Sequence, residues 1–355
     1  MHIEFLEMIV WAFPNDRTLD RLAVFDDSAR LTDEILPEVV ASRWGSDYRI
    51  ATCDRSVANY VPHGRYCFRV DLRLAHGPTG RVRPWSIYGK GRKGDKAEVL
   101  HRTLCRLWNS ESRIRGEIVI PRPLGYQPEY GLFWQEALDG RTLVLDADDA
   151  SMFGRAGAAI ARLHRTPVAC DRRIRVADVT ALLRANVGLL GQVRPATRVT
   201  LSAVHDRLAQ RAPHLDHETV ATLHDDLHPE NMLVDGERIA LIDLDGVSLG
   251  PPAYELGCFV ARVLHRALLE GKAPTAVHPI IQRFLKGYRA HADWPMPAAD
   301  IVWYTAAALV NERAFRSVKG LKSTFLETLD DLLGLAQIIS NGGDQALAVT
   351  LGSNA

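Results

Sequence analysis

Cysteines are few in this sequence, and their spacing is not typical of a zinc site or of a disulfide-stabilised protein. The 355-residue chain has five, at Cys53, Cys67, Cys105, Cys170 and Cys258. No C-x-x-C pair occurs among them, so neither a zinc site nor a disulfide-stabilised scaffold is expected. Scattered cysteines of this kind fit reduced thiols in the cytoplasm, which is the compartment we expect.

An excess of charge of one sign is also missing. The chain has 43 lysines and arginines against 43 aspartates and glutamates, giving a formal net charge of +0. Proteins that bind nucleic acid through phosphate attraction are usually strongly basic. No nucleic-acid partner is therefore expected.

Long hydrophobic runs are absent as well. The apolar stretch from Phe5 to Phe13 is interrupted by Glu7 and has neither a basic leader nor a convincing cleavage site, so no signal peptide is predicted. No segment has the uninterrupted apolar length of a membrane span. We expect no membrane partner, and the oligomeric state stays open.

The length of the chain exceeds what one hydrophobic core usually supports. We predict an α+β protein with two lobes. Residues 51–136 would form a small lobe built on an antiparallel sheet, and residues 137–355 a larger, mainly helical lobe. Residues 1–50 would extend the small lobe, with a possible strand at His2–Trp11 and helical spacing at Leu31–Val40.

The most informative segment is Leu223-His224-Asp225-Asp226-Leu227-His228-Pro229-Glu230-Asn231-Met232-Leu233-Val234. Asp226 and Asn231 lie five residues apart, with Pro229 between them. Proline discourages a helix and suits a tight loop, which can direct both side chains to one place.

A predicted hairpin follows this loop. Asp235-Gly236 is a strong two-residue turn signal between apolar strands. The returning strand, Ile239–Ile242, would bring Asp243 back beside the loop. A carboxylate, an amide and a second carboxylate would then converge, and such oxygen ligands suit magnesium better than zinc.

This string resembles the catalytic segment of the aminoglycoside phosphotransferase and choline kinase-like family, H-x-D-L-x-x-x-N followed by I-D-x-D/E. The resemblance implies a two-lobed protein-kinase-like fold. It also implies that Asp226 is the catalytic base, that Asn231 and Asp243 hold Mg²⁺, and that His224 and Asp245 support them.

Two departures from the family pattern are visible. Asp225 stands where the family usually has glycine between the histidine and the aspartate. The usual aspartate before the Pro-Ala-Tyr-Asp-Leu run is replaced in this chain, which reads Pro251-Pro252-Ala253-Tyr254-Glu255-Leu256-Gly257. Both departures concern loop shape and substrate more than the reaction.

The resemblance also implies an ATP site in the small lobe. Arg65, at a hairpin turn, and Lys90, at the end of an apolar strand, would face the phosphates, although each also suits an ordinary surface position. The lysine usually pairs with a glutamate of the next helix, predicted here at Lys96–Trp108. Glu98 is the only glutamate of that helix, and it lies away from the apolar face.

The segment Gly131–Gly140 resembles the hinge between the lobes. Its backbone near Glu136 and Leu138 would bind adenine, and a plain strand ending in a turn is the alternative. Further along, the spacing predicts a helix at Phe153–His164 and two helices broken at Pro195. His164 is expected to be a packed residue.

The acceptor cannot be read from the sequence. Trp294, Trp303, Tyr304 and Phe315 could line its pocket, but aromatics at helical spacing are more often core. An aminoglycoside, a sugar, an amino alcohol or a natural-product hydroxyl is compatible with the pattern. The helical region has nearly equal acids and bases, which gives a polycation no particular support.

The sequence thus predicts transfer of the ATP γ-phosphate to a small-molecule hydroxyl with Mg²⁺. A nucleotide-binding scaffold without turnover is the main alternative. A P-loop ATPase is disfavoured because G-x-x-x-x-G-K-S/T is absent, and a protein kinase because Asp243-Leu244-Asp245 is not Asp-Phe-Gly.

Overall fold

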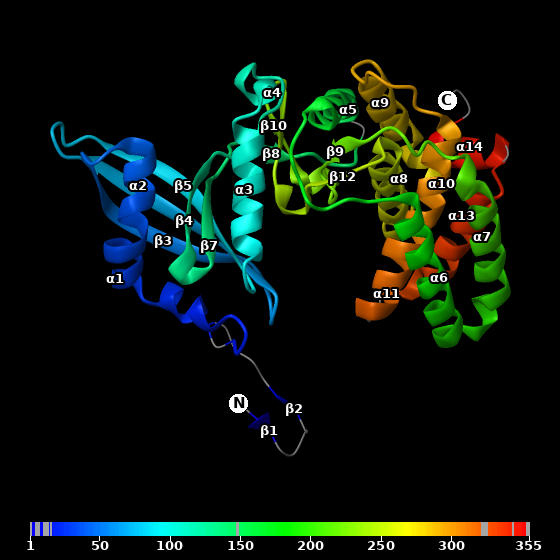
Figure 1. Cartoon of the computed structure of the whole chain (residues 1–355), viewed down its shortest axis with the longest axis horizontal. Coiled ribbons are helices and arrows are strands. Elements are labelled where there is room, and N and C mark those ends of the chain that lie inside the picture. The colour runs from blue at the N-terminus through cyan, green and yellow to red at the C-terminus, as the bar shows by residue number, and fades with distance from the viewer. Residues whose placement is uncertain are drawn as a thin grey trace. The chain divides into compact units, whose positions relative to one another are not determined.

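The computed structural model divides the chain into two compact units (Figure 1). Unit 1 comprises Met1–Asn109 and Pro121–Leu138, and unit 2 comprises Ser110–Ile120 and Asp139–Ala355. The described residues are 2–3, 8–9, 14, 16–146, 149–320, 326–342 and 344–352. Most of the strand expected at His2–Trp11 lies outside them, apart from the short pair β1 (His2–Ile3) and β2 (Met8–Ile9).

Unit 1 contains the predicted antiparallel sheet, in the order β3-β4-β5-β7-β6. The strands are β3 (Tyr48–Val61), β4 (Arg65–His76), β5 (Val82–Arg92), β6 (Pro123–Gln127) and β7 (Leu132–Glu136). Alternate residues of β4 are buried, as period-two alternation requires when one face of a sheet meets the core. Tyr66, Phe68 and Val70 lie on this buried face.

Residues before the sheet cover that face. Leu22, Phe25, Leu31 and Ile35 pack in one core with Phe68 and the other inward side chains. Helix α2 (Leu36–Trp44) continues this layer, in agreement with the helical spacing read from the sequence. Helix α3 spans Lys96–Trp108, the range that the apolar spacing predicts, and contacts β5, β6 and β7.

Short strands of unit 2 carry or flank the motif residues. β10 (Met232–Asp235) and β11 (Arg238–Leu241) form the predicted hairpin, and β8 (Arg141–Thr142) pairs with β10. Gly236 has φ 57°, the left-handed conformation that glycine adopts without strain. A second pair joins β9 (Ala221–Leu223) to β12 (Ser248–Gly250).

Helices make up most of the remaining described part of unit 2. They are α4 (Glu111–Ile114), α5 (Ala150–Arg165), α6 (Val176–Val193), α7 (Arg198–Arg211), α8 (Pro252–Leu269), α9 (His278–Arg289), α10 (Ala298–Ala308), α11 (Phe315–Gly320), α13 (Leu329–Ser340) and α14 (Asp344–Leu351). The chain breaks between α6 and α7 at Pro195, as predicted. No helix within the described ranges is long and apolar enough to cross a membrane.

The packing of α5 against α9 depends on glycine. A Cβ atom at Gly157 would collide with the backbone carbonyl of Phe284, and one at Gly287 would collide with that of Gly154. The two helices therefore approach each other through their backbones. This contact fixes α5, whose C-terminal end lies beneath the motif loop.

Candidate active site

Two unusual backbone conformations occur at the motif, one in the loop that connects β9 to β10 and one directly after β11. Asp225 has φ 63° and Asp243 has φ 58°, both in the left-handed region that non-glycine residues rarely adopt. Such conformations carry strain and occur often where a side chain must be directed to a functional position. Asp225 occupies the position where the family pattern has glycine, and its backbone still adopts the glycine-like conformation.

Hydrogen bonds link the loop of Asp226 and Asn231 to the end of the returning strand, next to Asp243. The side-chain amide of Asn231 donates to the carbonyl of Asp226 at 2.9 Å, and the N–H of Ile242 donates to the carbonyl of Asn231 at 3.0 Å. His224 donates through Nε2 to the carbonyl of Ile242 at 2.8 Å. Asp226, Asn231, His224 and Ile242, the residue before Asp243, therefore belong to one bonded cluster, and His224 is buried.

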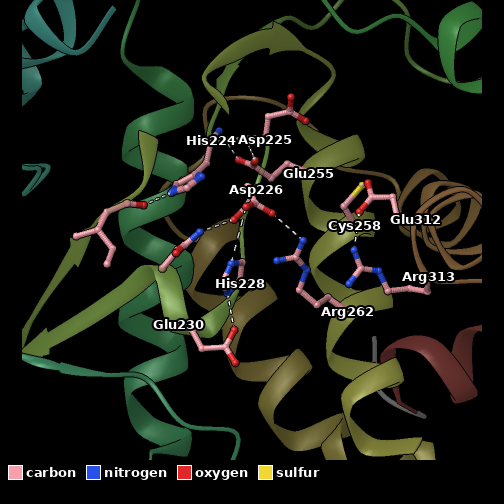
Figure 2. Close-up of polar contacts among 12 residues, drawn as sticks. His224, Asp225, Asp226, His228, Glu230, Glu255, Cys258, Arg262, Glu312 and Arg313 are labelled. Atoms are coloured by element: carbon pink, nitrogen blue, oxygen red, sulfur yellow. Dashed lines mark hydrogen bonds and ion pairs between the residues drawn. The ribbon is translucent and has the colours of Figure 1, made fainter. Parts of the chain in front are cut away.

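Asp226 forms an ion pair with Arg262, a residue that the sequence reading did not identify. Nη2 of Arg262 lies 2.8 Å from Oδ1 of Asp226, and Arg262 comes from α8 (Figure 2). Burial alone would raise the pKa of Asp226, but the charge and hydrogen bond of Arg262 outweigh it and the pKa is lowered. The carboxylate is thus ionised and oriented at neutral pH.

Glu255 anchors the loop from below. Its Oε2 accepts the backbone N–H of His224 at 2.9 Å, and its Oε1 accepts the backbone N–H of Asp225. Nε2 of His164 lies 2.7 Å from Oε2, and the side chains of His164 and Glu255 are 0% and 1% exposed. Tyr288 of α9 completes the network with 2.7 Å between its hydroxyl and Nδ1 of His164.

The hydrogen bonds of Glu255 also affect the pKa of its carboxyl group. Burial would raise the pKa of this carboxyl group, but the hydrogen bond and charge of His164, together with the backbone N–H of His224, lower it. A buried carboxylate is stable only with such partners. Glu255 lies in the Pro251–Gly257 run that follows the motif, and this residue holds the motif loop through two backbone N–H groups.

Asp225 extends the cluster on its other side. Its side chain is 3% exposed and Oδ2 lies 2.6 Å from Nη2 of Arg172. Burial raises the pKa of Asp225 to about 7, although Arg172 opposes the shift. The carbonyl of His224 would lie 2.9 Å from a Cβ atom at position 246, so only Gly246 fits against this part of the loop.

The remaining residue predicted in unit 2 lies close by in the chain. Asp245 is in the 3-10 turn η8 (Leu244–Gly246), directly after Asp243, and is partly buried. Its position next to the cluster agrees with a supporting role, which stays a prediction.

The residues predicted to bind nucleotide lie in unit 1. Lys90 is 7% exposed in β5, opposite Cys67 of β4 and Phe133 of β7. Arg65 is exposed at the start of β4. Glu98 is in the first turn of α3; burial lowers the pKa of His101, and the charge of Glu98 opposes part of that shift.

The predicted hinge residues follow β7. The backbone N–H of Glu136 donates to the carbonyl of Arg122, and its side chain accepts a hydrogen bond from Nε1 of Trp85 at 2.9 Å. Leu138 lies two residues further on and is partly buried. Adenine binding at these residues stays a prediction.

Sequence reasoning missed Arg262, Glu255 and Arg172 as members of the site. The first two lie on α8, seven residues apart, so helical periodicity places them on one face of that helix. The two charged residues at this helical spacing, in the helix that follows the motif, were the sequence signal that could have identified Glu255 and Arg262. Arg172 lies far from the motif in sequence, and no local pattern indicates its contact.

Comparison with protein families gives a match to the model described as the phosphotransferase enzyme family, over residues 106–312. The chain belongs to this family. A search of the curated proteins found no match.

Solved structures with the same fold include several phosphotransferases. Spectinomycin phosphotransferase APH(9)-Ia, in complex with ADP and spectinomycin, is 13% identical, with a TM-score of 0.53 over 87% of this chain and 98% of that chain. A choline/ethanolamine kinase family protein from Mesorhizobium loti is 16% identical, with a TM-score of 0.52 over 90% and 99% of the two chains.

Amicoumacin kinase hAmiN, in complex with AMP-PNP and Ca²⁺, is 14% identical, with a TM-score of 0.55 over 79% of this chain and 87% of that chain. The predicted family resemblance and the kinase-like α+β fold, with its antiparallel sheet followed by a mainly helical region, are thereby confirmed.

Proposed function

We propose that the chain is a small-molecule kinase, which transfers the γ-phosphate of ATP to a hydroxyl group with Mg²⁺. The observation that carries the proposal is the set of hydrogen bonds that joins Asp226 to Asn231, and Asn231 to Ile242, the residue before Asp243. Membership of the phosphotransferase family supports the reaction class. Structures of the same fold that hold ADP or AMP-PNP support a nucleotide as the phosphate donor.

Asn231 and Asp243 are the residues that would hold the metal. Their amide and carboxylate oxygens are the hard ligands that Mg²⁺ prefers. The described residues contain no group of three or more His, Cys, Asp or Glu side chains that could hold a metal alone. Phosphate oxygens and water would complete the shell, as is usual for magnesium bound with a nucleotide. When bound, the ion would offset the negative charge of the phosphates.

Asp226 takes the role of the base. It accepts the proton of the acceptor hydroxyl as that oxygen bonds to the γ-phosphorus, while the bond from phosphorus to the leaving ADP oxygen breaks. Arg262 holds Asp226 in one orientation at 2.8 Å. Little covalent chemistry falls to the protein in such a transfer, so position and charge are its main contributions.

Lys90, Arg65, Glu136 and Leu138 are proposed to bind the nucleotide, and Glu98 to support Lys90. The lysine would offset charge on the α and β phosphates, and the backbone at residues 136–138 would bind adenine. Supporting roles fall to His224, which bonds the carbonyl before Asp243, and to Asp245.

An acceptor screen tests this function. The purified chain is incubated with ATP, Mg²⁺ and hydroxylated small molecules, and acceptor-dependent ADP release and mass gain of one phosphate are measured. Asp226→Asn should lower turnover by about 10²–10⁴-fold, the usual contribution of general base catalysis, without loss of ATP binding. The matched control is Asp235→Asn, which alters an exposed aspartate of the neighbouring hairpin.

Two results would count against the proposal. An Asp226→Asn variant with full activity would remove the assigned base. Nucleotide binding without consumption of ATP for any acceptor would instead indicate a catalytically silent scaffold.

A further inference from the structure

Asp16 is a buried carboxylate that the proposed function does not use, and its side chain is 1% exposed. Oδ1 accepts hydrogen bonds from the backbone N–H groups of Thr18 at 2.8 Å and Leu19 at 3.0 Å. Oδ2 accepts hydrogen bonds from the hydroxyl of Tyr60 and the backbone N–H of His63, each at 2.8 Å. Both oxygens have the partners that a buried charge requires, and Oδ2 joins the N-terminal segment (residues 16–19) to a turn far along the chain.

The four donors keep the carboxyl group of Asp16 ionised. Burial raises the pKa of Asp16, but the four hydrogen bonds, led by that from the backbone of His63, outweigh burial and lower the pKa to about 2. Burial, together with the hydrogen bond to Asp16, raises the pKa of the Tyr60 hydroxyl to about 12. Asp16 is therefore a permanent acceptor at neutral pH, and Tyr60 a permanent donor.

The turn that Asp16 contacts joins β3 to β4 at residues 62–64. His63 has φ 59°, a left-handed conformation that is unusual for a residue with a side chain. Two further contacts fix its ring, because Nδ1 lies 2.7 Å from Oγ1 of Thr18 and 3.5 Å from Oδ1 of Asp16. A strained backbone persists only where the surrounding structure determines it in this way. The N-terminal segment thus holds the turn in one shape.

The backbone donors of this turn are already engaged. Pro62 has no N–H group, and the N–H of His63 donates to Asp16. The N–H of Gly64 donates to the carbonyl of Val61 at 3.1 Å. Successive backbone N–H groups of a turn can bind an anion, but here each one has a partner within the protein. A contact from this hairpin to a phosphate therefore has to come from a side chain.

Arg65, directly after the turn, is suited to make that contact. It alternates along β4 with the buried Tyr66, so its side chain lies on the opposite face of the sheet. Arg65 is paired in register with Arg92, and two residues further along β4, Cys67 is paired with Lys90. Because residues that lie opposite each other share a face, Arg65 and Lys90 lie on the same face in neighbouring rows.

We propose that Asp16 is a positioning residue for the nucleotide: it fixes the turn so that Arg65 is held beside Lys90 for the phosphates of ATP. The inference rests on the proposed phosphotransfer and gives the chain before the sheet a part in it. Asp16 does not touch the nucleotide and acts through Arg65. A guanidinium on a backbone that is fixed in advance loses less freedom on binding, so the same contact gives a higher affinity.

A double-mutant cycle on the full chain tests the inference, with calorimetric titration of a non-hydrolysable ATP analogue and Mg²⁺ as the measurement. Arg65→Gln should weaken binding about tenfold, because a charge-assisted hydrogen bond to phosphate is lost. Asp16→Asn should weaken it about five- to tenfold, because an amide cannot accept from all four donors and the turn is released. In the Arg65→Gln background, Asp16→Asn should change the affinity by less than about twofold.

Two further measurements separate positioning from a general loss of structure. Adenosine, which has no phosphate, should bind Asp16→Asn as tightly as the wild type. The backbone amide of His63 should exchange with solvent at least about tenfold faster in this variant. Asp27→Asn is the matched control and should alter neither, because this exposed aspartate of the same N-terminal region accepts the N–H of Arg30 at 3.1 Å.

Tyr60→Phe is a milder variant in case Asp16→Asn does not fold. It removes one donor and keeps the charge of Asp16 and its three backbone donors. Binding of the ATP analogue should weaken about two- to threefold, whereas that of adenosine should not change. Wild-type affinity of both Tyr60→Phe and Asp16→Asn for the ATP analogue would overturn the inference.

The outcomes distinguish this inference from the proposed function. Additive effects of Asp16→Asn and Arg65→Gln, or equal weakening of adenosine, would overturn the positioning role and leave the kinase proposal standing. Binding of the ATP analogue that depends on Asp16 through Arg65, without phosphate transfer to any acceptor, would uphold the positioning role and reject the kinase.

Discussion

The anchor beneath the motif loop can be tested by replacing Glu255 with glutamine. Glutamine has nearly the same shape but keeps only one acceptor oxygen. In the wild type both oxygens are used, because the N–H groups of His224 and Asp225 donate to them and His164 lies 2.7 Å away. Either orientation of the amide would place an NH₂ group against a backbone donor. The variant should therefore lose the loop anchor without creating a cavity.

The magnitude follows from the contacts. Leaving one buried donor unsatisfied costs about 1–3 kcal/mol, and breaking a buried ion pair costs about 3–5 kcal/mol. Since glutamine retains part of the network, we expect Glu255→Gln to lower the free energy of unfolding of unit 2 by about 2–4 kcal/mol. This is a large share of the total of about 5–15 kcal/mol that a typical protein possesses.

Urea unfolding and hydrogen exchange of the His224 and Asp225 amides provide the measurement. Both amides should exchange faster in the variant than in the wild type. Glu237→Gln is the control, because that carboxylate is 80% exposed and its pair with Arg155 should contribute less than about 1 kcal/mol. A loss below about 0.5 kcal/mol for Glu255→Gln, with unchanged exchange, would refute the anchoring argument.

The effect should also depend on pH. The pKa of Glu255 is lower in the folded chain than its usual value, so its contribution is present above the unfolded pKa. That contribution is lost as the pH falls through the folded pKa. The difference in stability between wild type and Glu255→Gln should therefore shrink in acid, and a constant difference would contradict the assignment.

Other predictions concern the same unit. Arg262→Gln removes the charge that lowers the pKa of Asp226, so the acid limb of the kcat/KM profile should move to higher pH; an unmoved limb would exclude the pair from catalysis. Gly157→Ala should destabilise the chain by about 1–3 kcal/mol in urea unfolding, because its Cβ would meet the backbone of α9, whereas Gly188→Ala, with open space around it, should be neutral or stabilising. Asp243→Asn should weaken Mg²⁺-dependent nucleotide binding at least tenfold in a calorimetric titration, and unchanged affinity would remove its proposed role.

Local signals in the sequence predicted the parts of the site that local chemistry determines. The Asp235-Gly236 signal and its flanking apolar strands predicted the β10–β11 hairpin, but Asp235 pairs with Arg238, so the two turn residues are Gly236 and Glu237, one position later than expected. The apolar spacing of residues 96–108 likewise specified α3 to the residue. In both cases neighbouring residues contain all the information that the element needs.

The contacts that orient the loop could not be predicted in the same way. Glu255 lies 31 residues from His224 and 91 from His164, and Arg262 lies 36 residues from Asp226. Only tertiary packing, in which α5 and α8 both contact β9, brings these side chains together. The sequence showed Asp225 as a departure from the family pattern. Its ion pair with Arg172 could not be predicted, because Arg172 lies 53 residues earlier in the chain (225 − 172 = 53).

The glycine contact between α5 and α9 couples the position of the motif loop to the position of α9. Backbones in direct contact leave no compressible side-chain layer, and Tyr288 on α9 bonds to His164, which bonds to Glu255. A small tilt of α9 would thus be transmitted to the peptide groups that hold the proposed base. Residues on the outer surface of α9 are accordingly places where selection or engineering could tune turnover without touching substrate.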